Sequence, residues 1–131
     1  MKPTIASRDD GSILLVTIFP VLSPTEATEH FAELAVRIEQ RERVAIVVDL
    51  SDVSVFSPTM RNLGAQEMQS LYRRVGSRVA GVAHVVRSAP TRGMLTAIHW
   101  LAPPPFVSVV LEDGAQALVW CRGRLRDPGR E

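Results

Sequence analysis

The sequence predicts an α/β fold, with a mixed, mostly parallel sheet of four to five strands, an N-terminal β-hairpin and four helices. Four β-rich, apolar runs alternate with four segments of helical pattern along the 131 residues. Such alternation is typical of parallel strands joined by right-handed crossovers. A content of 46% hydrophobic and 22% charged residues excludes disordered and fibrous classes. We therefore expect one domain over 1–131, with its core in about 11–125 and a frayed tail at 126–131.

The N-terminal segment carries the signals of a β-hairpin. Thr4–Ser7 is a short extended stretch, and Asp9, Asp10 and Gly11 form a turn sequence. The run that follows, Ser12–Phe19, is β-rich and almost continuously apolar. This pattern is typical of a central strand with both faces covered, so the hairpin is expected to add one antiparallel strand at the edge of the sheet.

The first helix is predicted by its capping sequence. Ser23 fits the N-cap, Pro24 the first helical position and Glu26 the third residue of a capping box. The helix is expected to end near Gln40–Arg43. Helical spacing divides its residues into a core-facing set and a polar, solvent-facing set. The first set is Ala27, Phe31, Leu34, Ala35 and Ile38, and the second is Glu26, Glu29, His30, Glu33 and Arg37.

A strand, a helix and another strand follow. Val44–Leu50 is a buried strand, and Ser57 with Pro58 again supplies an N-cap and a first-turn proline. The second helix is expected to stop at Gly76, and Val79–Val86 is the third long strand. An apolar stripe runs along four turns of this helix through Met60, Leu63, Gly64, Met68, Leu71 and Val75.

The last third of the chain predicts two more helices and a strand. A short helix covers Met94–Leu101, and Pro103–Pro105 must end it. Phe106–Leu111 is the final strand. Asp113 opens the last helix with the spacing of a second capping box. The core-facing residues of that helix are Ala117, Leu118, Cys121 and Leu125.

Three segments carry a family resemblance. Val47–Val53 (VVDLSDV) is a hydrophobic strand that ends in Asp-Leu-Ser-x-Val, and it is accompanied by Arg92–Leu101 and Leu111–Trp120. With the element order, these segments resemble STAS domains, the fold of anti-sigma-factor antagonists, and in particular the bacterial STAS/SEC14-like group. The resemblance extends over about Gly11–Leu125. It implies a STAS-like fold and a non-enzymatic regulatory or protein-interaction module.

The resemblance also implies a regulatory position that this sequence does not reproduce. STAS antagonists carry a phosphorylatable serine at the start of the helix that follows the Asp-Leu-Ser strand. Counting from Asp49 places Pro58 there, with Ser57 and Thr59 on either side. We therefore expect no phosphorylation of the antagonist type, and we interpret Ser57 as a helix N-cap.

Other function classes are disfavoured by composition. A net charge of +1 disfavours nucleic-acid binding, and no apolar run is long enough to span a membrane. A single cysteine, Cys121, excludes an internal disulfide and a thiolate metal cage. Asp49 lacks the acidic pair and late lysine of a receiver site, and the histidines are widely spaced. We expect no cofactor, no metal and no catalytic residue in a cytoplasmic protein, with an enzyme of undetected type as the weakest alternative.

Two helix N-termini form a candidate anion site. Both helices follow parallel strands, so their first turns are expected at the same edge of the sheet. Free N–H groups, helix dipoles and Arg side chains suit a phosphate, a carboxylate or a lipid head group. The alternative is that the hydroxyl residues only cap the helices. The candidate residues are Ser57, Thr59 and Arg61 at the beginning of one helix and Ser88, Thr91, Arg92 and Gly93 at the beginning of the next.

The third helix predicts a protein interface. It is apolar almost all round, and only Thr96 and His99 are polar. One face can pack against the sheet, and the remainder would leave an exposed apolar patch. We predict a homodimer or another protein partner that buries part of this region, with Trp100 as the anchor. The alternative is a deeply packed helix. The interface residues are Met94, Leu95, Ile98, Trp100 and Phe106.

Overall fold

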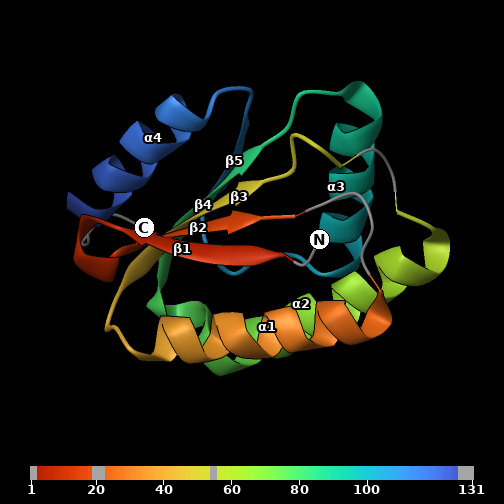
Figure 1. Ribbon diagram of the computed structural model, residues 1–131, viewed down its shortest axis with the longest axis horizontal. Coiled ribbons are helices and arrows are strands. Elements are labelled where there is room, and N and C mark those ends of the chain that lie inside the picture. The colour runs from red at the N-terminus through yellow and green to blue at the C-terminus, as the bar shows by residue number, and fades with distance from the viewer. Residues whose placement is uncertain (1–2, 19–22, 54–55, 127–131) are drawn as a thin grey trace.

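The computed structural model describes residues 3–18, 23–53 and 56–126. These residues form a sheet of five strands in the order β1-β2-β3-β4-β5, as Figure 1 shows. The first pair is antiparallel and the other three pairs are parallel, as the sequence predicts. The strands are β1 (Thr4–Arg8), β2 (Ile13–Thr17), β3 (Val44–Asp49), β4 (Val79–Val85) and β5 (Ser108–Leu111).

Helices cover both faces of the sheet. Within the described ranges, three helices pack on one face and a fourth packs on the other, over β3 and β4 (Figure 1). Short 3-10 turns, η1 (Asp9–Gly11) and η2 (Gly76–Arg78), precede β2 and β4. The helices are α1 (Pro24–Glu39), α2 (Pro58–Val75) and α3 (Ala89–Leu101) on the first face and α4 (Gly114–Arg126) on the second.

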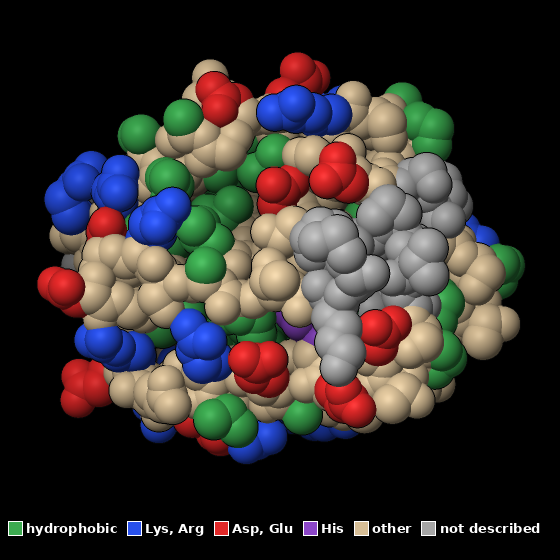
Figure 2. All heavy atoms as spheres, viewed as in Figure 1, with side chains coloured by type: hydrophobic (Ala, Val, Ile, Leu, Met, Phe, Trp, Pro, Cys, Tyr) green, Lys and Arg blue, Asp and Glu red, His purple; other side chains and the backbone are tan. Residues whose placement is uncertain are grey.

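Alternation along the strands divides the core into two clusters. Leu14 and Val16 of β2 face α1–α3, whereas Ile13 faces α4. In α4, Ala117 and Cys121 are fully buried, as their helical spacing predicts. Because α4 contacts mainly β3 and β4, apolar side chains beside it stay partly exposed, and Figure 2 shows them at the surface between α4 and β1.

The predicted caps fix the starts of α1 and α2. The Ser23 hydroxyl accepts a hydrogen bond from the Glu26 N–H at 3.1 Å, and the Glu26 carboxylate accepts one from the Ser23 N–H at 3.1 Å. The capping box is therefore confirmed. The Ser57 hydroxyl accepts a hydrogen bond from the Met60 N–H at 3.2 Å, which confirms Ser57 as the N-cap of α2.

Two predicted boundaries are wrong. The third helix begins at Ala89 rather than Met94, because Ser88 caps it and Pro90 in its first turn needs no hydrogen-bonded N–H. Strand β5 begins at Ser108 rather than Phe106, and the Phe106 ring packs edge-to-face on Tyr72 with 5.2 Å between centroids. Phe19 and residues 127–131 lie outside the described residues.

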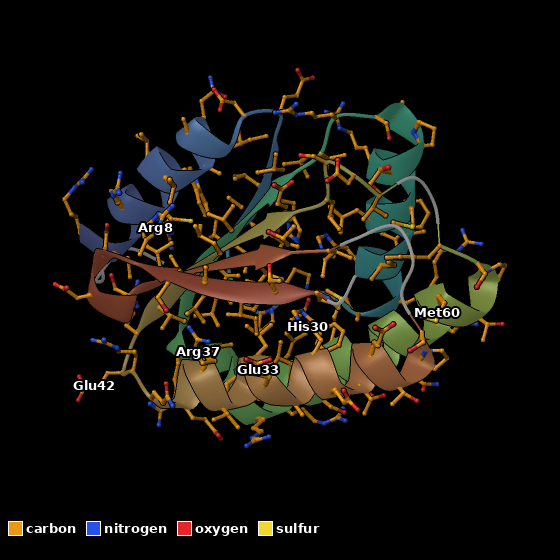
Figure 3. All side chains as sticks on the ribbon, viewed as in Figure 1. Arg8, His30, Glu33, Arg37, Glu42 and Met60 are labelled. Atoms are coloured by element: carbon orange, nitrogen blue, oxygen red, sulfur yellow. The ribbon has the colours of Figure 1, made fainter. Side chains whose placement is uncertain are left out.

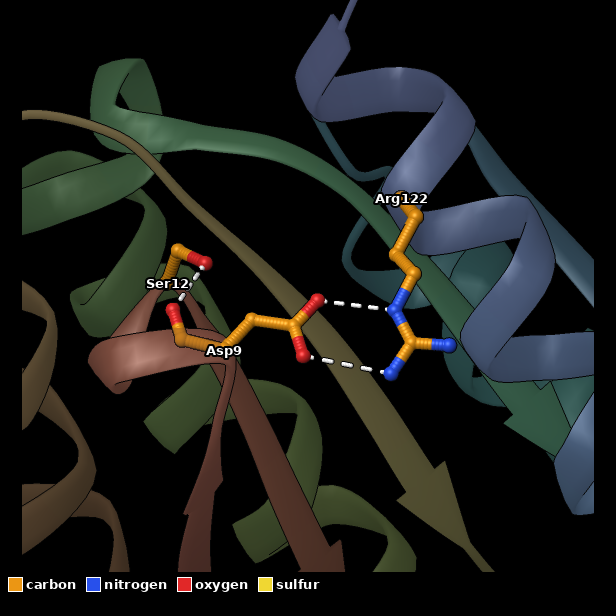
Figure 4. Close-up of polar contacts among 3 residues, drawn as sticks. All are labelled: Asp9, Ser12 and Arg122. Carbon is orange, nitrogen blue, oxygen red and sulfur yellow. Dashed lines mark hydrogen bonds and ion pairs between the residues drawn. The ribbon is translucent and has the colours of Figure 1, made fainter.

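The hairpin turn is joined to the C-terminal helix by an ion pair. Arg122 of α4 donates two hydrogen bonds to the Asp9 carboxylate, at 2.7 and 3.1 Å (Figure 4). The Ser12 hydroxyl donates to the Asp9 carbonyl oxygen at 2.8 Å. The turn itself uses positive φ at Asp9, Asp10 and Gly11, which the predicted turn sequence tolerates.

This ion pair gives the stability a defined pH dependence. The hydrogen bond from Arg122 lowers the pKa of Asp9 below its ordinary value of 3.8. A carboxyl with a lowered folded-state pKa stabilises the fold above about pH 4, and the effect is lost as the pH falls through the folded pKa. We expect the wild type and Arg122→Gln to differ more in urea unfolding at pH 6 than at pH 2. An equal difference at both pH values would contradict this assignment.

Candidate functional site

The predicted anion-site residues of α2 cap and begin that helix. Ser57 and Thr59 are exposed, and Arg61 is half-buried one turn further on. The Ser57 hydroxyl already accepts the Met60 N–H, and the Ser57 carbonyl oxygen accepts the Arg61 N–H at 2.9 Å. The helix start therefore satisfies part of its own polar groups, which agrees with the capping interpretation.

The corresponding residues of α3 have mainly internal contacts. The Ser88 hydroxyl accepts the Thr91 N–H at 3.2 Å and donates to the Thr91 hydroxyl at 2.7 Å. Thr91 is fully buried and donates in turn to the Val53 carbonyl oxygen at 2.7 Å. Its expected role as a ligand residue is therefore corrected, because its side chain holds the β3–α2 segment on α3. Arg92 is exposed and forms an ion pair with Glu112 at 3.8 Å.

The segment before α2 and the beginning of α3 are held together by buried contacts, and not by contacts between the predicted polar groups of the two helices. Besides the Thr91–Val53 bond, the Phe56 N–H donates to the Met94 sulfur at 3.1 Å. Across the described ranges, no hydrogen bond or ion pair joins the α2 candidates to the α3 candidates. Gly93 lies on the exposed side of α3, and a Cβ there would contact nothing within 4 Å. The proximity of the two helix starts is therefore structural.

The predicted interface residues differ in how far they are buried. Met94, Leu95 and Ile98 are buried in the cluster beneath α1–α3 and are core residues, which corrects their assignment to the interface. Phe106 is half-buried on Tyr72. By contrast, Trp100 is 80% exposed, and its neighbour Leu101 is 53% exposed. The exposed apolar surface at the end of α3 therefore contains fewer of the predicted interface residues than the sequence analysis expects.

An apolar cavity of about 150 Å³ lies between the sheet and α1, α2 and α3. His30 of α1 lines this cavity and is only 6% exposed, whereas the sequence places it on the solvent-facing side of the helix. That assignment is wrong: His30 follows Ala27 by three residues and precedes Leu34 by four, so helical spacing puts it on the buried side. Figure 3 shows His30 between α1 and the sheet.

Two histidines that are distant in the sequence meet in the structure. The rings of His84 in β4 and His99 in α3 have centroids 5.1 Å apart. Burial, and then the neighbouring His99, lower the pKa of His84 to about 4, so its ring is neutral at pH 7. Its Nδ1 lies 3.3 Å from the Val109 carbonyl oxygen. Sequence spacing gave no signal for this pair, because β4 and α3 bring the residues together only on folding.

The other titratable candidates have structural contacts. The Asp49 carboxylate accepts the Ser51 N–H at 2.9 Å, so it orients the loop as predicted. Cys121 is fully buried on the sheet-facing side of α4, and burial raises the pKa of its thiol to about 11, which disfavours a reactive thiolate. In the portion of the chain that the structure covers, no group of three or more His, Cys, Asp or Glu residues could hold a metal ion.

Comparison with known proteins gives a fold. No protein-family model matches the chain, and no curated protein matches it. An anti-sigma factor antagonist from Mycobacterium paratuberculosis has 20% identity and a TM-score of 0.60, over 92% of this chain and 95% of that one. A variant of RsbS from Moorella thermoacetica has 16% identity and a TM-score of 0.64, over 96% and 99%.

A third solved structure is an uncharacterised protein with a SpoIIAA-like fold from Shewanella loihica. It has 16% identity and a TM-score of 0.65, over 91% of each chain. At these identities the likeness establishes the fold, and the predicted fold class is confirmed. Among the described helices, none is long and apolar enough to cross a membrane.

Proposed function

Because the chain has a STAS-like fold, we propose that it acts as a non-enzymatic regulatory module that binds another protein. One similar structure is named as an anti-sigma factor antagonist, and the likeness covers nearly the whole of both chains. We place this activity in the cytoplasm, as the sequence predicts. The binding surface in this proposal is the exposed end of α3 and the segment that follows it.

The observation that carries the proposal is the exposure of Trp100. Tryptophan is the residue type most enriched at the energetic centres of protein interfaces, and it is costly to leave in water. Leu101 beside it and Val107 beyond the proline segment are also exposed. Burying a Trp of 150–250 Å² is worth about 4–6 kcal/mol before association costs are subtracted. The first partner to test is a second copy of this chain.

The test compares two apolar-to-acidic substitutions. We expect the wild type to self-associate in sedimentation velocity at high micromolar concentration, and Trp100→Glu to be monomeric and folded. Val119→Glu is the matched control, because Val119 is 64% exposed on α4, on the opposite face of the sheet. A wild type that stays monomeric would rule out self-association through this surface. If both variants lost self-association to the same extent, α3 would be ruled out as the interface.

The proposal does not include phosphorylation of the α2 start. Pro58 stands at the position where the family resemblance expects a phosphorylated serine, and it has no N–H to donate. We therefore expect the chain purified from its native host to carry no stoichiometric phosphate on Ser57 or Thr59. Intact-mass analysis with peptide mapping checks this, and a phosphate mapped to either residue would contradict it.

A further inference from the structure

The strongest unexplained feature is a buried polar atom without a partner, in a side chain that lines an apolar cavity. The Nδ1 atom of His30 is buried, and no group in the described part of the chain forms a hydrogen bond with it. Leaving such an atom unpaired costs about 1–3 kcal/mol, so buried polar atoms without partners are rare in folded proteins. The atom lies in a side chain that lines the 150 Å³ cavity. A ligand in that cavity could supply the missing partner.

The walls of the cavity define what fits. Apart from His30, the described side chains that line it with N–H or O–H groups are Tyr72 and His84, and none of the lining residues carries a formal charge at pH 7. Apolar side chains of β2–β4 and of the three helices form the rest. An apolar cavity of this volume is large enough for a benzene-sized molecule and too small for an extended acyl chain.

A glycine of α2 lines the cavity, and there is open space beside it. Gly64 lies on the same helical stripe as Met60 and Met68, which also line the cavity. A Cβ built on Gly64 would meet nothing within 4 Å. Met60 is partly exposed, and Figure 3 shows it at the end of α2 where the helix begins, which places one wall of the cavity near the surface.

We propose that this cavity binds a small, uncharged, phenol-sized molecule whose hydroxyl group forms a hydrogen bond with His30 Nδ1. Burial lowers the pKa of His30, so its imidazole is neutral at pH 7. In a neutral imidazole, one nitrogen donates and the other accepts. A hydroxyl can be either partner, whereas an anion would lose its hydration without meeting a cation. The ligand site is separate from Trp100, which does not line the cavity.

The first test fills the cavity from α2. Phenol and toluene are titrated into ¹⁵N-labelled protein, and binding is followed by NMR shifts of the residues that line the cavity. We expect the wild type to bind both probes, and Gly64→Leu to weaken both at least tenfold. Gly93→Leu is the matched control, because Gly93 is also a helical glycine with open space around it but lies outside the cavity. The proposal would be overturned if Gly64→Leu bound the probes as tightly as the wild type does. It would also be overturned if the wild type bound neither probe.

The second test removes the His30 Nδ1 atom and does not depend on the Gly64→Leu variant. We expect His30→Leu to weaken phenol binding about fivefold, the effect of one net hydrogen bond, and to leave toluene binding unchanged or tighter. Equal weakening of both probes would overturn the role of His30. If Gly64→Leu does not fold, this comparison decides the proposal. Trp100→Glu is expected to bind phenol like the wild type, so failure of the protein-interaction proposal and failure of this one are distinguishable.

Discussion

Replacing Ile38 by alanine is expected to lower the free energy of unfolding by about 2–5 kcal/mol. Ile38 is fully buried, with 0% of its surface exposed to solvent, and it packs in the cluster between α1, α2 and the sheet. The substitution removes three carbon atoms and leaves a hole that a close-packed core cannot fully close. Urea unfolding followed by circular dichroism measures the effect.

Val36→Ala on the same helix is the matched control. Val36 lies two residues away and is 47% exposed, so we expect a change within about 0.5 kcal/mol. A loss of similar size in both variants would contradict the orientation of α1. Because α1 also carries His30 into the cavity, such a result would remove the geometric basis of the ligand proposal as well.

Gly81→Val is expected to destabilise the fold by about 1–3 kcal/mol through overpacking. A Cβ at Gly81 in β4 would lie 2.6 Å from a ring carbon of Trp120 in α4 and 3.2 Å from the Val107 carbonyl oxygen. The strand can therefore accept only glycine while Trp120 stays in place. Thermal and urea unfolding of the variant measure the loss.

A second substitution separates this contact from a general intolerance of β4. We expect Trp120→Leu to restore part of the stability when it is combined with Gly81→Val, because the nearest atoms are removed. The coupling energy in the double-mutant cycle should favour the pair by at least about 0.5 kcal/mol. Strictly additive losses would show that α4 does not pack on Gly81.

The order of elements could be predicted because local signals and the fold agree. Ser23 with Glu26 and Ser57 with Pro58 mark helix starts that form as their chemistry dictates. The turn at Asp9–Gly11 and the apolar strands give the hairpin and the parallel sheet. The start of α3 differs from the prediction, because Ser88 caps the helix and Pro90 lies in its first turn.

The site could be predicted only in part, because side-chain environments depend on tertiary packing. Trp100 is exposed at the end of α3, whereas Met94 and Ile98 of the same helix are buried, and only the packing of α3 on the sheet separates them. Thr91 is a ligand candidate because of its place at a helix start, and its hydrogen bond to Val53 cannot be foreseen because the two residues are distant in the sequence. His30 was assigned to the polar face on residue type, although its spacing indicated the buried one.

Crosslinking in the native host tests directly whether the chain binds a protein through the exposed end of α3. A photo-crosslinking amino acid is placed at position 100 in one strain and, as a control, at position 119 on α4. We expect a discrete crosslinked protein, a second copy or another partner, at position 100 and none at position 119. No crosslink at position 100, or the same products from both positions, would contradict it.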